Sequence, residues 1–268
     1  MGEYGIAGRR FYWKSKTKRT LNIHLFEQGA PEIKRHILFK EFMLEHDDYA
    51  QVYSRLKQSL AEVFSEDIES YVNGKSSFVQ MIDYKTGSAK AKQLEAEDNI
   101  IIESYNTNWT KLAEAEIKAI KRISNQLSYV SIKHLGSTAV PELSSKPIID
   151  IFIAVNSIEE AKQWIKPLET FAYVFWNENP NKSHLRFFKG IPPFGEKRTH
   201  HIHIVQSGNS TIEHSVLFRD ILRRDQKIRL EYEALKIQLS QSHLTNRELY
   251  TDKKGEFIKK ILRENIAI

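Results

Sequence analysis

One carboxylate stands inside an apolar run near the middle of the chain. The run is Ile148-Ile149-Asp150-Ile151-Phe152-Ile153, and its β-branched and aromatic residues are typical of a strand, as are those of residues 130–132 upstream. An ionised carboxylate among such residues is costly unless a cation or several hydrogen-bond donors compensate it. We therefore expect Asp150 to face a partner of opposite charge or a donor network.

A turn with phosphate-binding chemistry precedes this strand. Gly136, Ser137 and Thr138 offer backbone N–H groups in a tight turn together with two hydroxyls, and this combination suits an oxyanion such as phosphate. Lys146 follows in the connecting loop, where it can pair with Asp150 or with a phosphate, or simply face water. The sequence thus predicts two strands flanking a loop that binds an anion.

Two histidines two residues apart offer further ligand atoms. His201 and His203 alternate along a predicted strand, residues 201–205, and so face the same side of it. Beside Asp150 they would form a His/His/Asp set, which favours manganese, zinc or iron over magnesium. The alternative is that they form hydrogen bonds within the sheet or face solvent. Arg186 lies on another predicted strand, where a triphosphate or an internal acid would explain its guanidinium.

The segment from His134 to Ile151 resembles the signature of a known family. It contains His-Leu-Gly-Ser-Thr-Ala-Val-Pro, followed by Lys-Pro-Ile-Ile-Asp-Ile. These motifs resemble the GrpB family within the nucleotidyltransferase superfamily, which has a DNA polymerase β-like fold. The resemblance implies an α+β fold with a mixed β-sheet, helices packed on it and a C-terminal helical segment.

The resemblance also implies metal chemistry, and one position departs from it. In that superfamily two or three carboxylates on adjacent strands hold divalent metal ions that bridge a triphosphate. The second acid is expected two residues after the first, where this chain has Phe152. Because one carboxylate does not hold a two-magnesium site, His201 and His203 are the candidate substitutes. The predicted cofactor is a divalent metal ion: manganese, zinc or magnesium.

The chain contains an internal repeat at a constant offset. Phe39, Tyr53, Tyr71, Lys75 and Phe78 recur 179 residues later as Phe218, Tyr232, Tyr250, Lys254 and Phe257. His24 matches His203 at the same offset, and residues 10–12 match residues 186–188 three residues out of step. The pattern indicates duplication, with a truncated half-copy over residues 1–83, a linker over residues 84–97 and a complete domain over residues 98–268.

The repeated residues are interpreted as structural. The first copy lacks the Gly-Ser and Asp signature, so residues shared by both copies need not serve that signature. Salt bridges or packing are therefore expected for Arg219, Asp220, Tyr250 and Lys254, and core positions for Tyr232 and Phe257. A structural hydrogen bond is likewise the preferred role of His134.

Periodicity and capping signals locate the remaining elements. The first copy is predicted to have strands over residues 9–14 and 21–26 and helices over residues 33–45, 48–63 and 67–82, the last interrupted near Gly74. In the second copy these signals predict a strand at 100–102, a helix capped at Thr107 or Asn108 with an apolar face that extends to Leu127, and a helix over 158–170. Strands are predicted at 186–189 and 201–205, and helices over 216–224, 228–242 and 246–263. Because two strands bury little surface, we expect the half-copy to pack on the complete copy, with a homodimer as a further option.

Composition excludes several classes of protein. The chain has no cysteine, which excludes disulfides and thiolate metal sites. The net charge of +6 suits a phosphorylated ligand, while the lack of a dense Lys/Arg stripe interleaved with aromatics disfavours nucleic acid. No run reaches membrane-spanning length and no secretory signal is visible, so the predicted location is cytoplasmic. Walker, dinucleotide-binding, HExxH and Gly-x-Ser-x-Gly motifs are absent from the sequence.

Together these features predict a GrpB-like protein that binds a nucleotide or another phosphorylated small molecule with a divalent metal ion, and that transfers a nucleotidyl group. The predicted catalytic residues are Asp150 and Ser137. The predicted phosphate-binding residues are Gly136, Ser137, Thr138, Lys146 and Arg186, and the predicted metal ligands are Asp150, His201 and His203. Two alternatives stay open: a catalytically inactive nucleotide-binding or assembly module, and a His/Asp metal-dependent phosphohydrolase.

Overall fold

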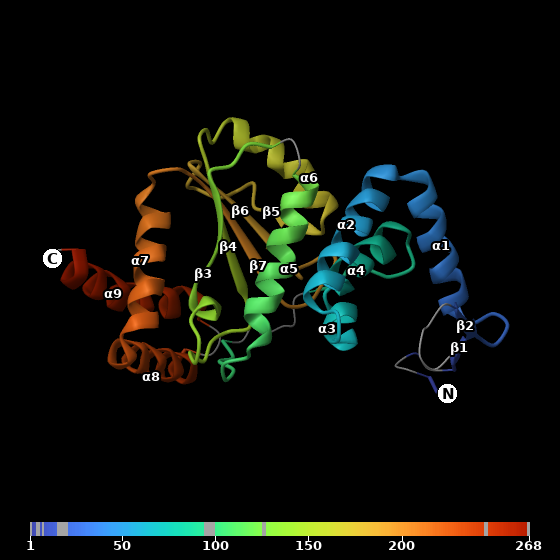
Figure 1. Ribbon diagram of the computed structural model, residues 1–268, viewed down its shortest axis with the longest axis horizontal. Coiled ribbons are helices and arrows are strands. Elements are labelled where there is room, and N and C mark those ends of the chain that lie inside the picture. The colour runs from blue at the N-terminus through green and yellow to red at the C-terminus, as the bar shows by residue number, and fades with distance from the viewer. Residues whose placement is uncertain are drawn as a thin grey trace.

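The computed structural model is an α+β protein built around a mixed five-stranded β-sheet (Figure 1). It describes residues 2–3, 6, 8–14, 21–93, 100–124, 127–243 and 246–266. The sheet contains β3 (Ser131–Leu135), β4 (Ile149–Val155), β7 (His200–Gln206), β6 (His184–Lys189) and β5 (Tyr173–Phe175), in that spatial order. β4 pairs parallel with β7, and every other neighbouring pair is antiparallel.

The alternation of side chains along β4 decides what each face of the sheet does. Ile149, Ile151 and Ile153 are buried in the main core, beneath α5 (Asn108–Ile123) and α6 (Ile165–Thr170). Asp150 and Phe152 point to the opposite face, since successive strand residues alternate. The apolar run therefore supplies a core on one side and leaves the carboxylate on the other.

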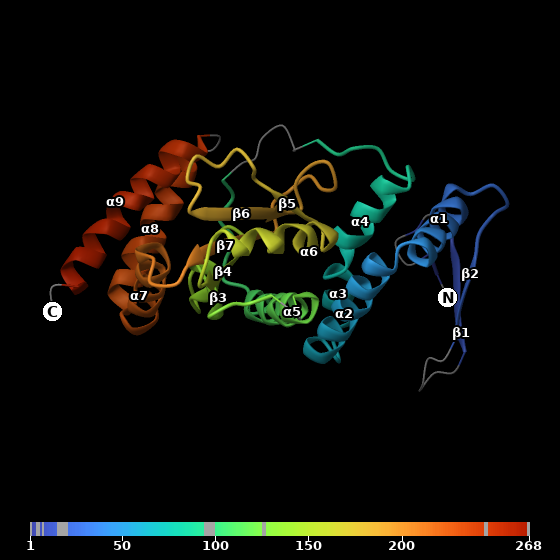
Figure 2. The same cartoon turned by 90° about the horizontal axis from the view of Figure 1, so that it is seen from above.

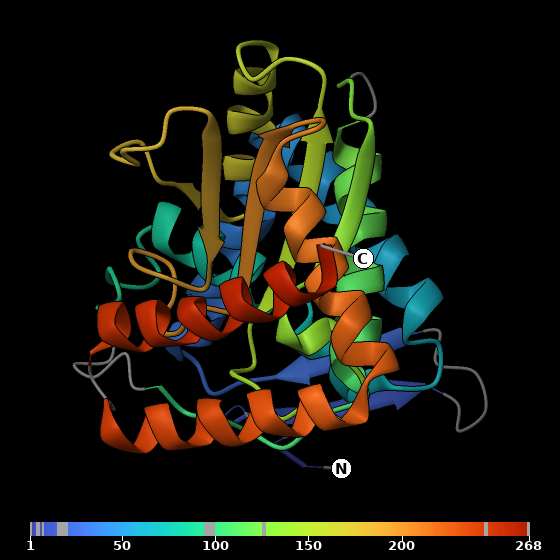
Figure 3. The same cartoon turned by 90° about the vertical axis from the view of Figure 1, so that its left-hand side faces the viewer.

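Three C-terminal helices cover that second face. They are α7 (Ser210–Arg224), α8 (Gln226–Ser242) and α9 (Arg247–Ile266), and in Figure 3 they lie in front of the sheet. Their apolar side chains pack around Val140 and Leu143 of the loop that joins β3 to β4. α7 begins earlier than the predicted residue 216, because the side chain of Asn209 accepts a hydrogen bond from the backbone N–H of Thr211 and caps the helix there.

Two other predicted elements differ from the structure, and one observed strand was not predicted. Residues 100–102 form no strand, and only an isolated bridge joins Glu103 to Ser145. The predicted helix over residues 158–170 is divided into the short 3₁₀ helix η2 (Glu160–Trp164) and α6; the Ser157 hydroxyl accepts from the Glu160 N–H at 3.3 Å, as expected. β5 was not predicted, because three residues are too few to show a period of two.

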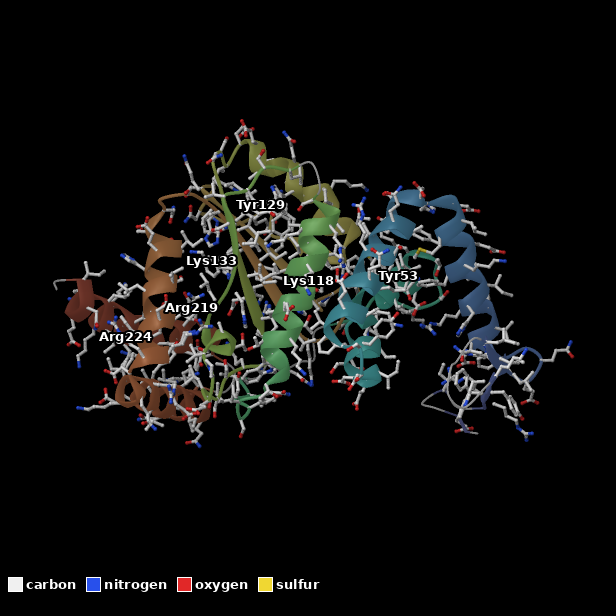
Figure 4. All side chains as sticks on the ribbon, in the orientation of Figure 1. Tyr53, Lys118, Tyr129, Lys133, Arg219 and Arg224 are labelled. Carbon is white, nitrogen blue, oxygen red and sulfur yellow. The ribbon has the colours of Figure 1, made fainter. Side chains whose placement is uncertain are left out.

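The N-terminal helices share the main core with α5 and the five-stranded sheet. They are α1 (Pro31–Glu45), α2 (Asp47–Val63), α3 (Ile68–Asn73) and α4 (Ser76–Lys85). Buried residues of α2 and α4 belong to the same apolar cluster as those of α5 and the sheet, and α2 packs along α5. At this seam Arg55 donates to the carbonyl of Arg122 at 2.7 Å, and Lys118 lies 3.6 Å from the Glu62 carboxylate (Figure 4).

The N-terminal hairpin stands apart from this core. β1 (Arg10–Lys14) and β2 (Leu21–Leu25) form a separate two-stranded sheet at the end of the molecule remote from α9 (Figure 2). Leu21, Ile23 and Leu25 remain about half exposed. The expected cover for the half-copy therefore involves its helices and not its strands. The basic turn at residues 15–19 and the end of the predicted linker, residues 94–97, lie outside the described residues.

The register of the two hairpins corrects one alignment. Phe11 pairs with His24 in the first hairpin, whereas Arg186 pairs with His203 in the second. If His24 corresponds to His203, then Phe11, and not Arg10, occupies the position of Arg186. The sequence match of residues 10–12 with residues 186–188 is therefore out of step with the strand pairing by one residue.

Candidate functional site

The strand order brings the predicted metal ligands together. Asp150 on β4 is directly paired with His201 on β7, and His203 follows two residues later on the same face. His201 Nδ1 lies 3.1 Å from Asp150 Oδ1, and His203 Nε2 lies 3.8 Å from the same oxygen. One ligand atom from each residue falls within 4.8 Å of the others, and among the described residues this is the one such group of three.

Two neighbours fix the orientation of His203. Its Nδ1 lies 3.0 Å from His184 Nε2, so its Nε2 is directed toward Asp150. The ring of Phe152 stacks on it, with centroids 4.3 Å apart and planes 3° from parallel. The position where the resemblance would place a second carboxylate is thus occupied by a side chain that supports a candidate ligand.

The electrostatics favour an anionic Asp150 beside a neutral His203. Burial raises the pKa of Asp150, but hydrogen bonds from His201 and His203 more than reverse this effect, so the pKa lies well below its ordinary value. Burial lowers the pKa of His203. A carboxylate and neutral imidazoles are the protonation states in which these side chains ligate metals.

The residues present fit a divalent metal ion. His201 Nε2 is buried, and it has no hydrogen-bond partner among the described residues. Such an atom calls for an additional group, since buried polar atoms are normally satisfied. His201 Nδ1 and His203 Nε2, which lie 3.1 and 3.8 Å from Asp150 Oδ1, are compatible with a shared ion at about 2.0–2.2 Å from each, and the buried His201 Nε2 would then be the ring nitrogen left to donate to a further group.

The turn after β3 approaches Asp150 closely because it begins with glycine. Gly136 has φ 75° and ψ −174°, a conformation that is essentially restricted to glycine. A Cβ at this position would lie 2.3 Å from Asp150 Oδ2. Ser137 follows at the start of the 3₁₀ helix η1 (Ser137–Ala139).

A cavity of about 380 Å³ separates the sheet from the C-terminal helices. The sheet and its loops contribute seven of the eight predicted site residues to its lining: Gly136, Ser137, Lys146, Asp150, Arg186, His201 and His203. The helices contribute His214, Arg219, Tyr232, Lys236, Tyr250 and Lys254, among others. Asp150 is the one acidic residue among the cavity's lining residues, so the cavity is strongly basic.

Arg186 lies in this cavity between aromatic rings. Its guanidinium carbon is 5.2 Å from the centroid of Trp176 and 5.3 Å from that of Phe188. Its Nε is buried, and no described residue accepts a hydrogen bond from it. A donor held in place but left unsatisfied is well suited to an anionic ligand.

Thr138 does not line the cavity. Its side chain is buried, and its hydroxyl donates to the Ile148 carbonyl at 3.0 Å. That hydroxyl must then accept the 3.0 Å hydrogen bond from His134 Nε2, which makes His134 the donor. These bonds give Thr138 and His134 structural roles, so Thr138 is removed from the phosphate-binding set.

The half-buried His134 is expected to make the protein less stable in mild acid. Burial lowers its pKa to about 4, against an ordinary value of 6.5. The unfolded chain therefore takes up this proton first as the pH falls below 6.5, and stability is lost between pH 6.5 and 4, by up to about 3 kcal/mol for this group. Urea unfolding measures the free energy of unfolding at pH 7 and at pH 4.5. The decrease between the two pH values should be smaller in His134→Gln than in the unaltered protein, because the glutamine amide keeps a donor to Thr138 but takes up no proton. Equal losses in both proteins would contradict this.

The helix side of the cavity was not predicted as a site. Tyr250, Lys254 and Arg219 were interpreted as structural because they recur in both copies, and Lys236 was not singled out. One feature of the sequence could have indicated it. Lys236 lies one turn after Tyr232 on the buried side of α8, and a lysine at a buried position usually has a partner there.

The fold and the site together define an α+β protein whose sheet presents one carboxylate and two imidazoles to a basic cavity. The chain belongs to the GrpB family: the family model described as "GrpB protein" matches residues 1–85 and 99–264.

Relatives and a solved structure agree with this assignment. A UPF0157 protein of Pseudomonas aeruginosa is 38% identical over 64% of this chain and 69% of its own length. A UPF0157 protein of Bacillus subtilis is 37% identical over 58% of this chain, although the match spans only 44% of that relative. The crystal structure of the conserved protein GrpB from Enterococcus faecalis superposes with a TM-score of 0.52 at 32% identity, over 60% of this chain and 99% of that one.

The helices were compared with the length and hydropathy of a membrane span. Within the described ranges, none combines the length and the apolar character that crossing a bilayer requires.

Proposed function

We propose that this GrpB-family protein binds a nucleotide or another phosphorylated small molecule together with a divalent metal ion, and that it transfers a nucleotidyl group to a small acceptor. The observation that carries the proposal is the cluster of Asp150, His201 and His203 at the wall of a basic cavity, next to the glycine-serine turn. The same observation supports membership of the nucleotidyltransferase superfamily.

Each residue has a role in this proposal. Asp150, His201 and His203 hold the metal ion, which supplies charge neutralisation and Lewis acidity when bound. Ser137 and the backbone after Gly136 orient a phosphate beside it. Arg186 donates to the phosphate from between its aromatic neighbours, and the loop residue Lys146, which lines the same cavity, pairs with the phosphate as well.

We also infer that residues 1–83 are a partial second copy, joined through residues 84–97 to the complete copy at 98–268. The bounds of α1 and α7, and of α2 and α8, differ by 179 residues at both ends. The rings also pack alike. Phe39 meets Tyr53 edge-on at 5.5 Å and Tyr53 stacks on Phe78 at 5.0 Å; Phe218, Tyr232 and Phe257 repeat this with 5.1 and 5.5 Å.

Metal retention tests the function directly. The protein is loaded with Mn²⁺, Zn²⁺ or Mg²⁺, dialysed and assayed by mass spectrometry, with about one ion per chain expected. Asp150→Asn is expected to lose the ion, and His203→Gln to weaken it at least tenfold, since each removes a ligand. The control is His24→Gln, which removes the repeat-equivalent histidine of the separate hairpin and should change nothing.

The outcome also separates the alternatives. A thermal shift with nucleoside triphosphate that needs the metal, followed by pyrophosphate release in the presence of an acceptor, selects nucleotidyl transfer. Metal-dependent release of inorganic phosphate without an acceptor selects a phosphohydrolase. If the protein retains no metal and shows no nucleotide-dependent thermal shift, the result selects a binding or assembly module without this chemistry.

A further inference from the structure

We propose that β2 (Leu21–Leu25) pairs edge to edge with β2 of a second copy of this chain, so that two N-terminal hairpins join into one four-stranded antiparallel sheet. The hairpin lies at the end of the molecule remote from α9 (Figure 2), away from the five-stranded sheet. This interface goes beyond the proposed function, since it involves neither the cavity nor the candidate metal ligands.

β2 is an edge strand without the usual protection against pairing. Among the described strands it pairs with β1 alone, and each of its five residues is exposed. Its sequence, Leu-Asn-Ile-His-Leu, contains no lysine, arginine or acid. Burial, with the nearby charge of Arg9, lowers the pKa of His24, so this histidine is neutral at pH 7. Exposed edges normally carry charged side chains that hinder pairing with another chain.

The other strand edges of the described chain are covered or blunted. The outer edge of β1 is bridged by Gly2, whose carbonyl accepts from the Phe11 N–H at 3.3 Å. At one edge of the five-stranded sheet β3 carries the exposed Lys133, and Arg219 donates to the carbonyl of His134 at 3.2 Å. At the other edge β5 is only three residues long. Natural proteins use such features against edge-to-edge association, and β2 has none of them.

The repeat-equivalent strand β7 has a partner on each edge. It begins 179 residues after β2, and it pairs with β6 on one side and with β4 on the other. In that sheet Ile202 and Ile204 are completely buried, whereas the equivalent Ile23 and Leu25 are 47% and 50% exposed. Because a two-stranded sheet is only marginally stable, a further strand at the free edge of β2 would stabilise the hairpin.

The sequence of β2 is complementary to itself in an antiparallel pair. With Ile23 on a twofold axis, Ile23 meets its own copy, Leu21 lies opposite Leu25, and Asn22 lies opposite His24. Apolar side chains then face apolar ones, polar side chains face polar ones, and no like charges are opposed, which favours cross-strand pairing. A symmetric dimer requires such a self-complementary patch, so a second copy is the partner that fits.

Stacking the open faces of two hairpins would be less favourable than pairing their edges. The register of the hairpin pairs Arg10 with Leu25 and Lys14 with Leu21, so both cations share a face with Ile23. Stacked faces would bring these cations of two copies together, and neither strand has an acid to compensate them. Edge pairing keeps them on the outer strands of the four-stranded sheet.

Analytical ultracentrifugation of the full chain at increasing concentrations tests the dimer. A monomer–dimer equilibrium is expected, and Ile23→Lys should weaken it at least tenfold, because two ammonium groups would meet at the axis. Val72→Lys is the matched control. Val72 lies on α3 and is 49% exposed, and its substitution should leave the equilibrium within twofold.

Cysteine cross-linking tests the register. The chain has no cysteine, so each introduced thiol is the only one in its chain. Ile23→Cys should form a covalent dimer with oxidised glutathione, because opposed Cβ atoms of an antiparallel pair lie about 4.5–5.5 Å apart. Leu21→Cys alone should not, whereas an equimolar mixture of Leu21→Cys and Leu25→Cys should.

The opposite results would overturn the proposal. A chain that is monomeric at every concentration would leave the edge of β2 to a strand of a different polypeptide. A dimer that Ile23→Lys and Val72→Lys weaken equally, or cross-linking of Leu21→Cys but not of Ile23→Cys, would place the contact elsewhere. If Ile23→Lys does not fold, judged by circular dichroism, the cross-linking variants decide. Metal retention by monomeric Ile23→Lys is expected, so this interface and the proposed function stand or fall separately.

Discussion

Replacing Glu116 with alanine is expected to lower the free energy of unfolding by about 3–5 kcal/mol. Glu116 on α5 forms a buried ion pair with Lys189 on β6, and the two side chains are 6% and 5% exposed. The Tyr173 hydroxyl donates to the same carboxylate at 2.7 Å. Burial opposes ionisation of Glu116, but the charge of Lys189 outweighs it and holds the pKa of Glu116 below its ordinary value. The substitution leaves a buried ammonium without a counter-charge.

Urea unfolding followed by tryptophan fluorescence measures this loss. Glu159→Ala is the matched control, because Glu159 forms an exposed ion pair with Lys162, and it should cost less than about 0.5 kcal/mol. The double variant Glu116→Leu with Lys189→Met should recover part of the stability, since it removes both charges. A loss in Glu116→Ala no larger than that in Glu159→Ala would show that the pair does not hold α5 on the sheet.

Replacing Gly136 with alanine is expected to damage both the backbone and the site. The backbone conformation alone should cost about 1–3 kcal/mol. The added Cβ, 2.3 Å from Asp150 Oδ2, must also displace that carboxylate from its place beside His201. We therefore expect a fall in unfolding free energy together with at least a tenfold loss of metal affinity.

Gly208→Ala separates these two effects. Gly208 also has a positive φ, of 77°, but a Cβ there would meet nothing within 4 Å. It should lose stability from backbone strain and keep its metal affinity. If Gly136→Ala retained metal as well as Gly208→Ala does, the close approach of the turn to Asp150 would have no part in binding.

The elements were predictable where a clear period or cap exists. A run of β-branched and aromatic residues identified β4, β7 was expected over residues 201–205, and helical spacing identified α2 with nearly its observed bounds. The errors have physical causes. The strand expected at residues 100–102 does not form, since the isolated bridge to Ser145 is made by Glu103, and β5 is too short for its pattern to show. In both cases strand formation depends on pairing with residues that are distant in the sequence, and a local sequence pattern carries no information about that pairing.

The site was predictable on its sheet side and not on its helix side. Asp150, His201 and His203 stand out because polar residues in apolar strands need partners, and the parallel pairing of β4 with β7 places them side by side. Lys236 and Lys254 reach the cavity through the packing of α8 and α9 against the β3–β4 loop. Helix packing of this kind depends on contacts between residues that are distant in the sequence and could not be predicted from it. Without that packing, the repeat at constant spacing indicated only a structural role for these residues.

The core shared by the N-terminal helices, α5 and the sheet affects how the protein unfolds. Buried side chains of α2 and α4 continue without a break into those of α5 and the sheet. Loosening the N-terminal helices would therefore expose the apolar sides of α5 and α6, which cover the face of the sheet opposite Asp150, and the two halves should melt as one cooperative unit. The hairpin of β1 and β2 lies outside that unit. Its amide hydrogens should exchange with solvent long before those of β4.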